Sequence, residues 1–346
     1  MNKPIKVLIA DDSKVSTQLL AAILEEASDI QVIATARDGI EAIQLTKQLK
    51  PDLITMDIFM PNMDGIDATR TIMAECPTPI IIISSQYNKT MAENSFNALE
   101  AGALSIIEKP KGPAANDFAE AKKFILHSIR ALAGVPVVTR KRTKPLDSSP
   151  PEPNIEQNFK ILALGSSTGG PAALSCILQG LSSDFNLPIV ITQHITKGFL
   201  EGLISWLQHQ TPLKLEIAKH RQLLKPGHVY FAPDDFHLTV ARGLVEPIAI
   251  LEDSMPINHF KPSANVLFTS IAESYPNKAI GGILTGMGRD GAEGLLLMKK
   301  SGCYTFAQSK STSVVFGMPG AAVEMQAINK IIDLEQISKF LAKICK

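Results

Sequence analysis

Short runs of β-branched and other apolar residues alternate with stretches of helical spacing from the start of the chain. The runs that predict strands span residues 6–10, 32–36, 53–56, 80–83 and 105–107. The stretches that predict helices span residues 17–26, 39–49, 65–74, 91–101 and 115–132. Parallel strands need connections that cross over the sheet, so the alternation predicts a parallel sheet with helices on both faces.

The same rhythm restarts near residue 158. It predicts strands at 161–164, 189–192, 229–232, 279–284 and 304–307, and helices at 171–181, 199–209, 291–301 and 334–343. Residues 134–157 lack apolar periodicity and are rich in proline, serine and charge, which is typical of a linker. We therefore expect an α/β domain at 1–125, a helix end and linker at 126–157, and a second, doubly wound α/β domain at 158–346.

Composition removes several classes of function. Lysine plus arginine and aspartate plus glutamate balance at 34 each, so no net field draws the chain to nucleic acid or to an anionic membrane. The cysteines are too scattered for a zinc site or a disulfide framework: Cys76, Cys176, Cys303 and Cys345. No apolar run approaches the roughly 18 residues of a membrane span, and Asp11 follows the first apolar run too soon for a signal peptide. We expect a cytoplasmic protein that is not inserted in a membrane.

Polar side chains stand at the carboxyl ends of the strands in the first domain. Asp11 and Asp12 follow the first strand, Asp57 the third, Ser84 ends the fourth and Lys109 follows the fifth. Such ends meet in one crevice, where three carboxylates repel one another unless a hard cation such as Mg²⁺ joins them. Taken singly, the aspartates are also ordinary helix caps and the lysine an ordinary turn residue. Together they predict a carboxylate that accepts a phosphoryl group.

Three motifs carry a resemblance. Ile-Ala-Asp-Asp-Ser at 9–13, Met-Asp-Ile-Phe-Met-Pro-Asn-Met-Asp-Gly at 56–65 and Glu-Lys-Pro at 108–110 resemble the receiver domain of two-component response regulators, which has a flavodoxin-like fold. The resemblance implies that Asp57 is phosphorylated by a histidine kinase. It further implies Mg²⁺ binding by Asp11, Asp12, Asp57 and the Phe59 carbonyl, and phosphoryl sensing by Ser84 and Lys109. Tyr87, just past that serine, is either a residue that helps to carry the signal or an ordinary surface tyrosine.

A glycine-rich turn opens the second domain. Gly165, Ser167 and Gly169 match G-x-S-x-G between a predicted strand and a predicted helix, the setting that exposes a nucleophilic serine at a helix N-terminus. A phosphate-binding turn is the alternative. The segment lacks the lysine of the phosphate-binding loop and does not fit G-x-G-x-x-G, so a hydrolase serine is favoured.

A base and an acid stand at two further strand ends. His194 directly follows the strand at 189–192, whereas the other six histidines lie elsewhere: His127, His209, His220, His228, His237 and His259. Asp290 lies in a loop with three glycines after the strand at 279–284, although it could also cap the next helix. Convergence would give a Ser-His-Asp triad, with the backbone N–H groups of Thr168 and Met287 as oxyanion donors.

A closer resemblance covers most of the second domain. Ile-Thr-Gln-His at 191–194, Pro-Gly-His-Val-Tyr-Phe-Ala-Pro at 226–233, Leu-Thr-Gly-Met-Gly-Arg-Asp-Gly-Ala at 284–292 and Val-Val-Phe-Gly-Met-Pro at 314–319 are similar to the chemotaxis protein-glutamate methylesterases, the CheB family. The resemblance implies a catalytic triad of Ser167, His194 and Asp290 that needs no cofactor. Its implied substrates are glutamate methyl esters, and certain glutamines, of methyl-accepting chemotaxis receptors.

Two other functions compete with this one. An output domain that only binds, for example to DNA, fits poorly because the second domain has no basic face and no compact helix-turn-helix pattern. The same hydrolase acting on another receptor or on a small ester stays open.

Overall fold

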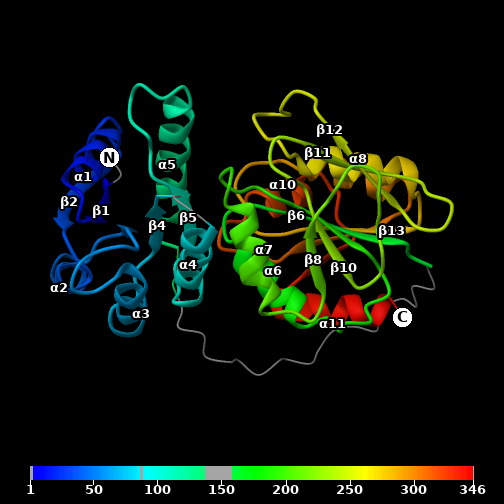
Figure 1. Cartoon of the computed structure of the whole chain (residues 1–346), viewed down its shortest axis with the longest axis horizontal. Helices are drawn as coiled ribbons and strands as arrows, with labels where there is room; N and C mark the ends of the chain where they lie inside the picture. Colours follow the sequence, from blue (N-terminus) through cyan, green and yellow to red (C-terminus); the bar gives the residue numbers. More distant parts are fainter. Residues whose placement is uncertain (1–2, 86–88, 136, 138–157, 346) are drawn as a thin grey trace. The chain divides into compact units, whose positions relative to one another are not determined.

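The computed structural model describes residues 3–85, 89–135, 137 and 158–345 (Figure 1). The chain divides into two compact units, Met1–Asp147 and Ser148–Lys346, and each is taken here by itself. Tyr87 and most of the expected linker lie outside the described residues. The domain limits at 125 and 157 therefore stay predictions.

The first unit is the expected five-stranded parallel sheet. Its strands are β1 (Ile5–Ala10), β2 (Ile30–Ala36), β3 (Leu53–Met56), β4 (Ile80–Ser84) and β5 (Ser105–Glu108), in the order β2-β1-β3-β4-β5. The helices are α1 (Lys14–Glu25), α2 (Gly39–Leu49), α3 (Gly65–Glu75), α4 (Lys89–Glu100) and α5 (Phe118–Leu132). Every residue of the central β3 is buried, as both faces of a parallel sheet require. The predicted fold of this unit is confirmed.

The second unit is built on a seven-stranded parallel sheet in the order β15-β14-β13-β6-β7-β10-β8. The strands are β6 (Ile161–Ser166), β7 (Ile189–Gln193), β8 (Lys214–Ile217), β10 (His228–Phe231), β13 (Ala279–Ile283), β14 (Tyr304–Gln308) and β15 (Lys330–Ile332). The helices are α6 (Gly170–Gln179), α7 (Leu200–Gln208), α8 (Ala264–Ser274), α9 (Ala292–Lys300), α10 (Met318–Glu324) and α11 (Leu334–Ile344). The direction of winding reverses at β6, which pairs with β7 on one side and β13 on the other. Ligands of such sheets bind at this switch point.

Several elements were not predicted. They are β8, β15, α8, α10 and a three-stranded antiparallel sheet of β9 (Gln222–Leu223), β11 (His237–Ala241) and β12 (Ile248–Glu252). Helix α8 packs against β11, and its N-cap residue, Ser263, makes no side-chain cap bond to the helix. Serine is a common N-cap residue, so Ser263 was a local signal for this helix start that the sequence prediction missed.

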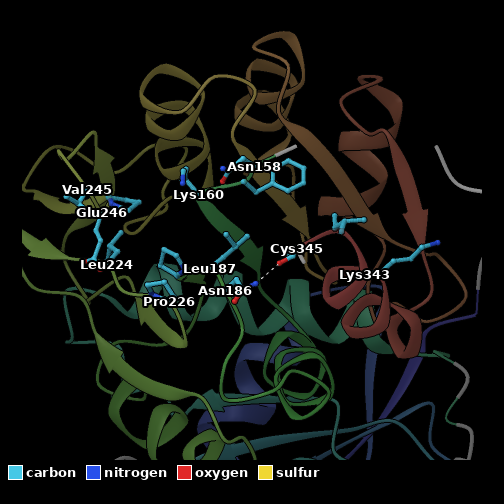
Figure 2. A pocket seen from close by; sticks show the side chains of 14 residues that line it. Asn158, Lys160, Asn186, Leu187, Leu224, Pro226, Val245, Glu246, Lys343 and Cys345 are labelled. Carbon is cyan, nitrogen blue, oxygen red and sulfur yellow. Dashed lines mark hydrogen bonds between the residues drawn. The ribbon is translucent and has the colours of Figure 1, made fainter. Parts of the chain in front are cut away.

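Within the described ranges, none of the helices combines the length and apolar character needed to cross a membrane. A cavity of about 790 Å³ lies beside Lys160 and Pro188, which precede β6 and β7 (Figure 2). Asn186 donates to the carbonyl of Cys345 at 3.2 Å on its wall. This cavity is at the amino ends of the strands, the edge opposite to the predicted catalytic residues.

Two candidate functional sites

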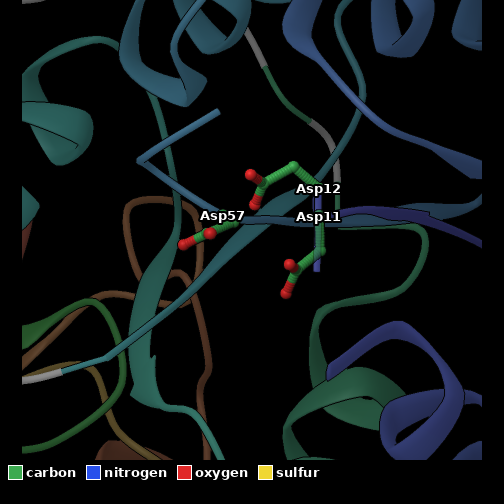
Figure 3. A group of neighbouring side chains, drawn as sticks. All are labelled: Asp11, Asp12 and Asp57. Carbon is green, nitrogen blue, oxygen red and sulfur yellow. The ribbon is translucent and has the colours of Figure 1, made fainter. Parts of the chain in front are cut away.

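Three carboxylates meet at the carboxyl ends of β1 and β3 (Figure 3). Asp11, Asp12 and Asp57 each place an oxygen within 4.8 Å of the others, with Asp11 and Asp57 buried and Asp12 exposed. The N–H of Ile58 donates to Asp57 Oδ1 at 2.8 Å, which holds one oxygen of that carboxylate in place. The structure thus brings together the acidic residues that the strand ends predicted.

Lys109 joins this acidic cluster. Its Nζ lies 2.7 Å from Asp57 Oδ2 and 2.8 Å from Asp11 Oδ2. Burial raises the pKa of Asp57, and the attraction of Lys109 does not fully offset it, while Asp11 adds repulsion. Burial opposes the charge of Lys109, but hydrogen bonds to Asp11 and Asp57 outweigh it and raise the pKa of the ammonium group. Three carboxylates therefore share a single ammonium group, so negative charge exceeds positive charge in this cluster.

A hard cation fits this cluster. Carboxylate oxygens are the ligands that Mg²⁺ prefers, and a divalent ion would oppose the burial and the smaller repulsion from Asp11 that raise the pKa of Asp57. The hydroxyl of Ser84, at the end of β4, is buried and has no hydrogen-bond partner within the described part of the chain. An unused buried hydroxyl is suited to an incoming phosphoryl oxygen. Phe59, the fourth expected ligand through its carbonyl, lies two residues after Asp57.

The second site begins at the turn between β6 and α6. Ser167 directly follows β6 and is 6% exposed, and Gly169 adopts a φ of +77°, which glycine reaches without strain. The N–H of Ser167 donates to the Thr285 carbonyl at 3.1 Å. A Cβ added to Gly286 would lie 2.8 Å from the Ser167 Cβ, so the loop after β13 rests directly against the serine.

That contact bears on the expected oxyanion donors. Thr168 and Met287 flank the contact between Ser167 and Gly286 on the two loops. Neither of their N–H groups donates a hydrogen bond to another described residue. Both groups thus have the capacity that an oxyanion site requires.

His194 and Asp290 form a buried pair. His194 Nε2 lies 2.8 Å from Asp290 Oδ2, and the two side chains are 8% and 0% exposed. The other ring nitrogen, Nδ1, is buried and has no partner among the described residues. The His194 N–H donates to the Ser166 carbonyl at 2.9 Å, which ties the base to the nucleophile turn. With Nε2–H directed at the carboxylate, Nδ1 carries the lone pair that can accept a proton.

Asp290 is held by the start of α8. Oδ1 accepts from the Ser263 hydroxyl at 2.7 Å and the Asn265 N–H at 3.1 Å, and Oδ2 from the Ala264 N–H at 2.6 Å. Burial favours the neutral acid, but His194, Ser263 and Ala264 outweigh it and lower the pKa of Asp290. The alternative role as cap of the following helix is wrong, because the carboxylate caps α8 and the N-cap of α9 is Gly291.

Sequence reasoning missed Gln193, which joins the turn after β6 to the end of β7. The buried amide of Gln193 accepts from the Ser166 hydroxyl at 2.6 Å and donates to the carbonyls of Ser167 at 3.0 Å and His194 at 2.7 Å. A Cβ on Gly170 would come within 2.1 Å of its Oε1, so the amide fills its space. The sequence signal for Gln193 was its position next to His194 in the Ile-Thr-Gln-His motif.

His237, which the sequence did not select as the base, contacts a residue that binds Asp290. His237 is fully buried, where Nδ1 accepts from the Ser263 N–H at 3.1 Å and Nε2 lies 3.1 Å from the Met255 carbonyl. It acts on the site only by supporting Ser263. Val314 also went unassigned, although it packs on Gly169 of the nucleophile turn.

Comparison with known proteins shows the family of this chain. Residues 162–341 match the family model described as CheB methylesterase, and residues 7–116 match the response regulator receiver domain. The chain belongs to the CheB methylesterase family. This chain is similar to a protein-glutamate methylesterase/protein-glutamine glutaminase of Syntrophus aciditrophicus, with 42% identity over 98% of each chain. A Myxococcus xanthus relative with the same activities in its name is 41% identical over 98% of this chain and 97% of its own.

A solved structure agrees with the second unit. The CheB methylesterase catalytic domain of Thermotoga maritima is 36% identical and superposes with a TM-score of 0.53, covering 54% of this chain and 98% of that domain. The family's order of receiver and esterase is the order of the two units here. The family and fold predictions are thereby confirmed.

Proposed function

We propose that this CheB family member is a phosphorylation-regulated hydrolase that removes methyl groups from glutamate γ-methyl esters and deamidates specific glutamines on methyl-accepting chemotaxis receptors. The observation that carries the proposal is the buried His194–Asp290 pair, in which His194 Nδ1 has no partner among the described residues. His194 follows β7, and Ser167 follows the neighbouring strand β6 at the switch point of the sheet. The relatives' names supply the substrate class.

The reaction is acyl transfer. Ser167 Oγ bonds to the γ-carbonyl carbon while its proton passes to His194 Nδ1, and Asp290 stabilises the imidazolium. The N–H groups of Thr168 and Met287 hold the oxyanion. The tetrahedral intermediate collapses, and methanol, or ammonia in deamidation, leaves with the proton from His194. Water then attacks the acyl-enzyme by the same route and releases glutamate and free Ser167.

The receiver is the switch. Asp57 takes a phosphoryl group from a histidine kinase, and Asp11, Asp12, Asp57 and the Phe59 carbonyl would hold Mg²⁺, which neutralises charge on the phosphoryl oxygens. Lys109 pairs with a phosphoryl oxygen once Asp57 is modified, and the Ser84 hydroxyl donates to another. The unused hydroxyl of Ser84 and the Lys109 bridge support these roles. We place the protein in the cytoplasm, free of nucleic acid.

The test is methanol release from methylated chemoreceptor membranes, with and without a small-molecule phosphodonor. We expect release that requires Ser167 and rises with the phosphodonor in the wild type but not in Asp57→Asn. Hydrolysis of a small ester together with no release from receptor membranes would leave the hydrolase and overturn the receptor substrate.

A further inference from the structure

The ring of Phe260 lies flat against the imidazole of His194. The ring centroids are 4.1 Å apart and the planes differ by 6°. Phe260 belongs to the segment between β12 and α8, and none of the sequence motifs pointed to it. One face of the proposed base, His194, is therefore covered by a hydrocarbon ring.

The backbone places this ring firmly. Ile257 and Phe260 exchange two backbone hydrogen bonds, of 3.0 Å and 2.9 Å, across a two-residue turn. Asn258 and His259 in the turn have φ values of 49° and 71°, the left-handed pair of a tight hairpin turn. Three residues further on, Ser263 donates to Asp290. One short segment thus holds both the imidazole face and the carboxylate.

The stacked contact attracts a charged imidazole more strongly than a neutral one, because the face of the Phe260 ring carries partial negative charge. A cation within about 6 Å of a ring centroid is attracted to that face. The attraction between the Phe260 ring and the imidazole is therefore strongest when His194 has taken the proton of Ser167. An interaction that strengthens toward the transition state raises kcat rather than lowering KM.

We propose that Phe260 is a positioning residue of the esterase site, which holds the His194 imidazole and stabilises the imidazolium formed when Ser167 is deprotonated. The inference rests on the proposed function, because it takes His194 as the base. It adds a residue that acts through the base and has no role in the Ser-His-Asp scheme.

Fluorination of this ring in the full-length chain tests the inference, because each added fluorine withdraws charge from the ring face while the shape stays nearly constant. With fluorinated phenylalanines at position 260, we expect kcat for methanol release to fall stepwise, by about tenfold for the trifluoro ring, with KM unchanged. Phe260→Trp should keep the wild-type kcat, and Phe260→Leu should lose about as much as the trifluoro ring.

A matched control is available in the same unit. Lys330 Nζ lies 4.9 Å from the ring centroid of Phe340 on α11, so fluorination there weakens a similar contact away from the triad. We expect it to leave kcat unchanged. If kcat stays constant across the fluorinated variants at position 260, the ring only fills space and the inference is overturned. If KM rises at constant kcat, the ring contacts the substrate and the inference is likewise overturned.

A second measurement separates this inference from the substrate proposal. The rate at which phenylmethylsulfonyl fluoride sulfonylates Ser167, followed by mass spectrometry, needs the base but no receptor. We expect the same stepwise decline in this rate across the fluorine series. Wild-type protein that reacts normally but releases no methanol from receptors contradicts the proposed function alone, whereas sulfonylation rates that do not change across the series contradict the role of Phe260.

Discussion

Asp290 binds His194 through the same carboxylate that caps helix α8. The Oδ2 atom lies 2.8 Å from His194 Nε2 and also accepts from the Ala264 N–H at 2.6 Å. The positive end of a helix dipole favours the ionised acid. The triad therefore depends on a helix start 25 to 27 residues earlier in the chain. Its contacts and those of the receiver site lead to four predictions.

The two adjacent serines should behave differently. Ser167→Ala removes the nucleophile and should lower methanol release by roughly 10³-fold or more. Ser166→Ala removes only the hydroxyl that donates to Gln193, and should lower kcat by about fivefold, since a buried hydrogen bond contributes about 1 kcal/mol. Steady-state methanol release measures both. Greater loss in Ser166→Ala than in Ser167→Ala would reverse the assignment of the nucleophile.

Gln193 should affect catalysis because it joins the segments that carry Ser167 and His194. Gln193→Glu keeps the shape but removes the two N–H donors to the Ser167 and His194 carbonyls. We expect kcat to fall by roughly 10- to 100-fold with KM little changed, because misplacement of the nucleophile and base affects the chemical step. Gln179→Glu, on the surface end of α6, is the matched control and should keep wild-type kinetics. A Gln193→Glu enzyme of normal kcat would contradict the role.

Asp290→Asn should affect both activity and the pH dependence of stability. We expect kcat to fall by roughly 10³- to 10⁴-fold, as for loss of the orienting acid in other triads. The folded state lowers the pKa of Asp290, so the ionised acid stabilises the fold above its ordinary pKa of about 3.9. This contribution is lost as the pH falls through the lowered value.

Thermal unfolding between pH 2 and pH 6 checks the second part. The wild-type Tm should fall more steeply than that of Asp290→Asn below about pH 4, since only the wild type carries the titrating group. Parallel curves would show that the Asp290 contacts do not favour its ionised form.

The receiver site should require both its acceptor and a divalent cation. Removal of Mg²⁺ with a chelator should abolish phosphoryl incorporation from a small-molecule donor, because Lys109 alone does not balance the three carboxylates. Asp57→Asn should abolish incorporation even with Mg²⁺ present, whereas Asp52→Asn on the surface before β3 should not. Incorporation measured by intact mass decides this. Persistent labelling of Asp57→Asn would identify another acceptor.

Much of this protein could be predicted from its sequence alone. In a parallel sheet the carboxyl ends of the strands share one edge, so the order of strands and the residues that follow them already indicated that Asp11 and Asp57, or Ser167 and His194, belong together. The motifs around these residues indicated the protein family, which the comparisons confirmed. These conclusions depend on local pattern and topology, which a linear chain displays.

Only the tertiary structure decided what holds the catalytic residues. The sequence pattern left open that Asp290, besides its expected place in the triad, caps the helix that follows it, but its carboxylate caps α8, a helix whose start has no side-chain cap of its own. Phe260 stacks on a residue 66 positions earlier, as the chain numbering shows. Hydrogen bonds and ring contacts between distant segments depend on packing in three dimensions, and no residue spacing along the chain encodes them directly.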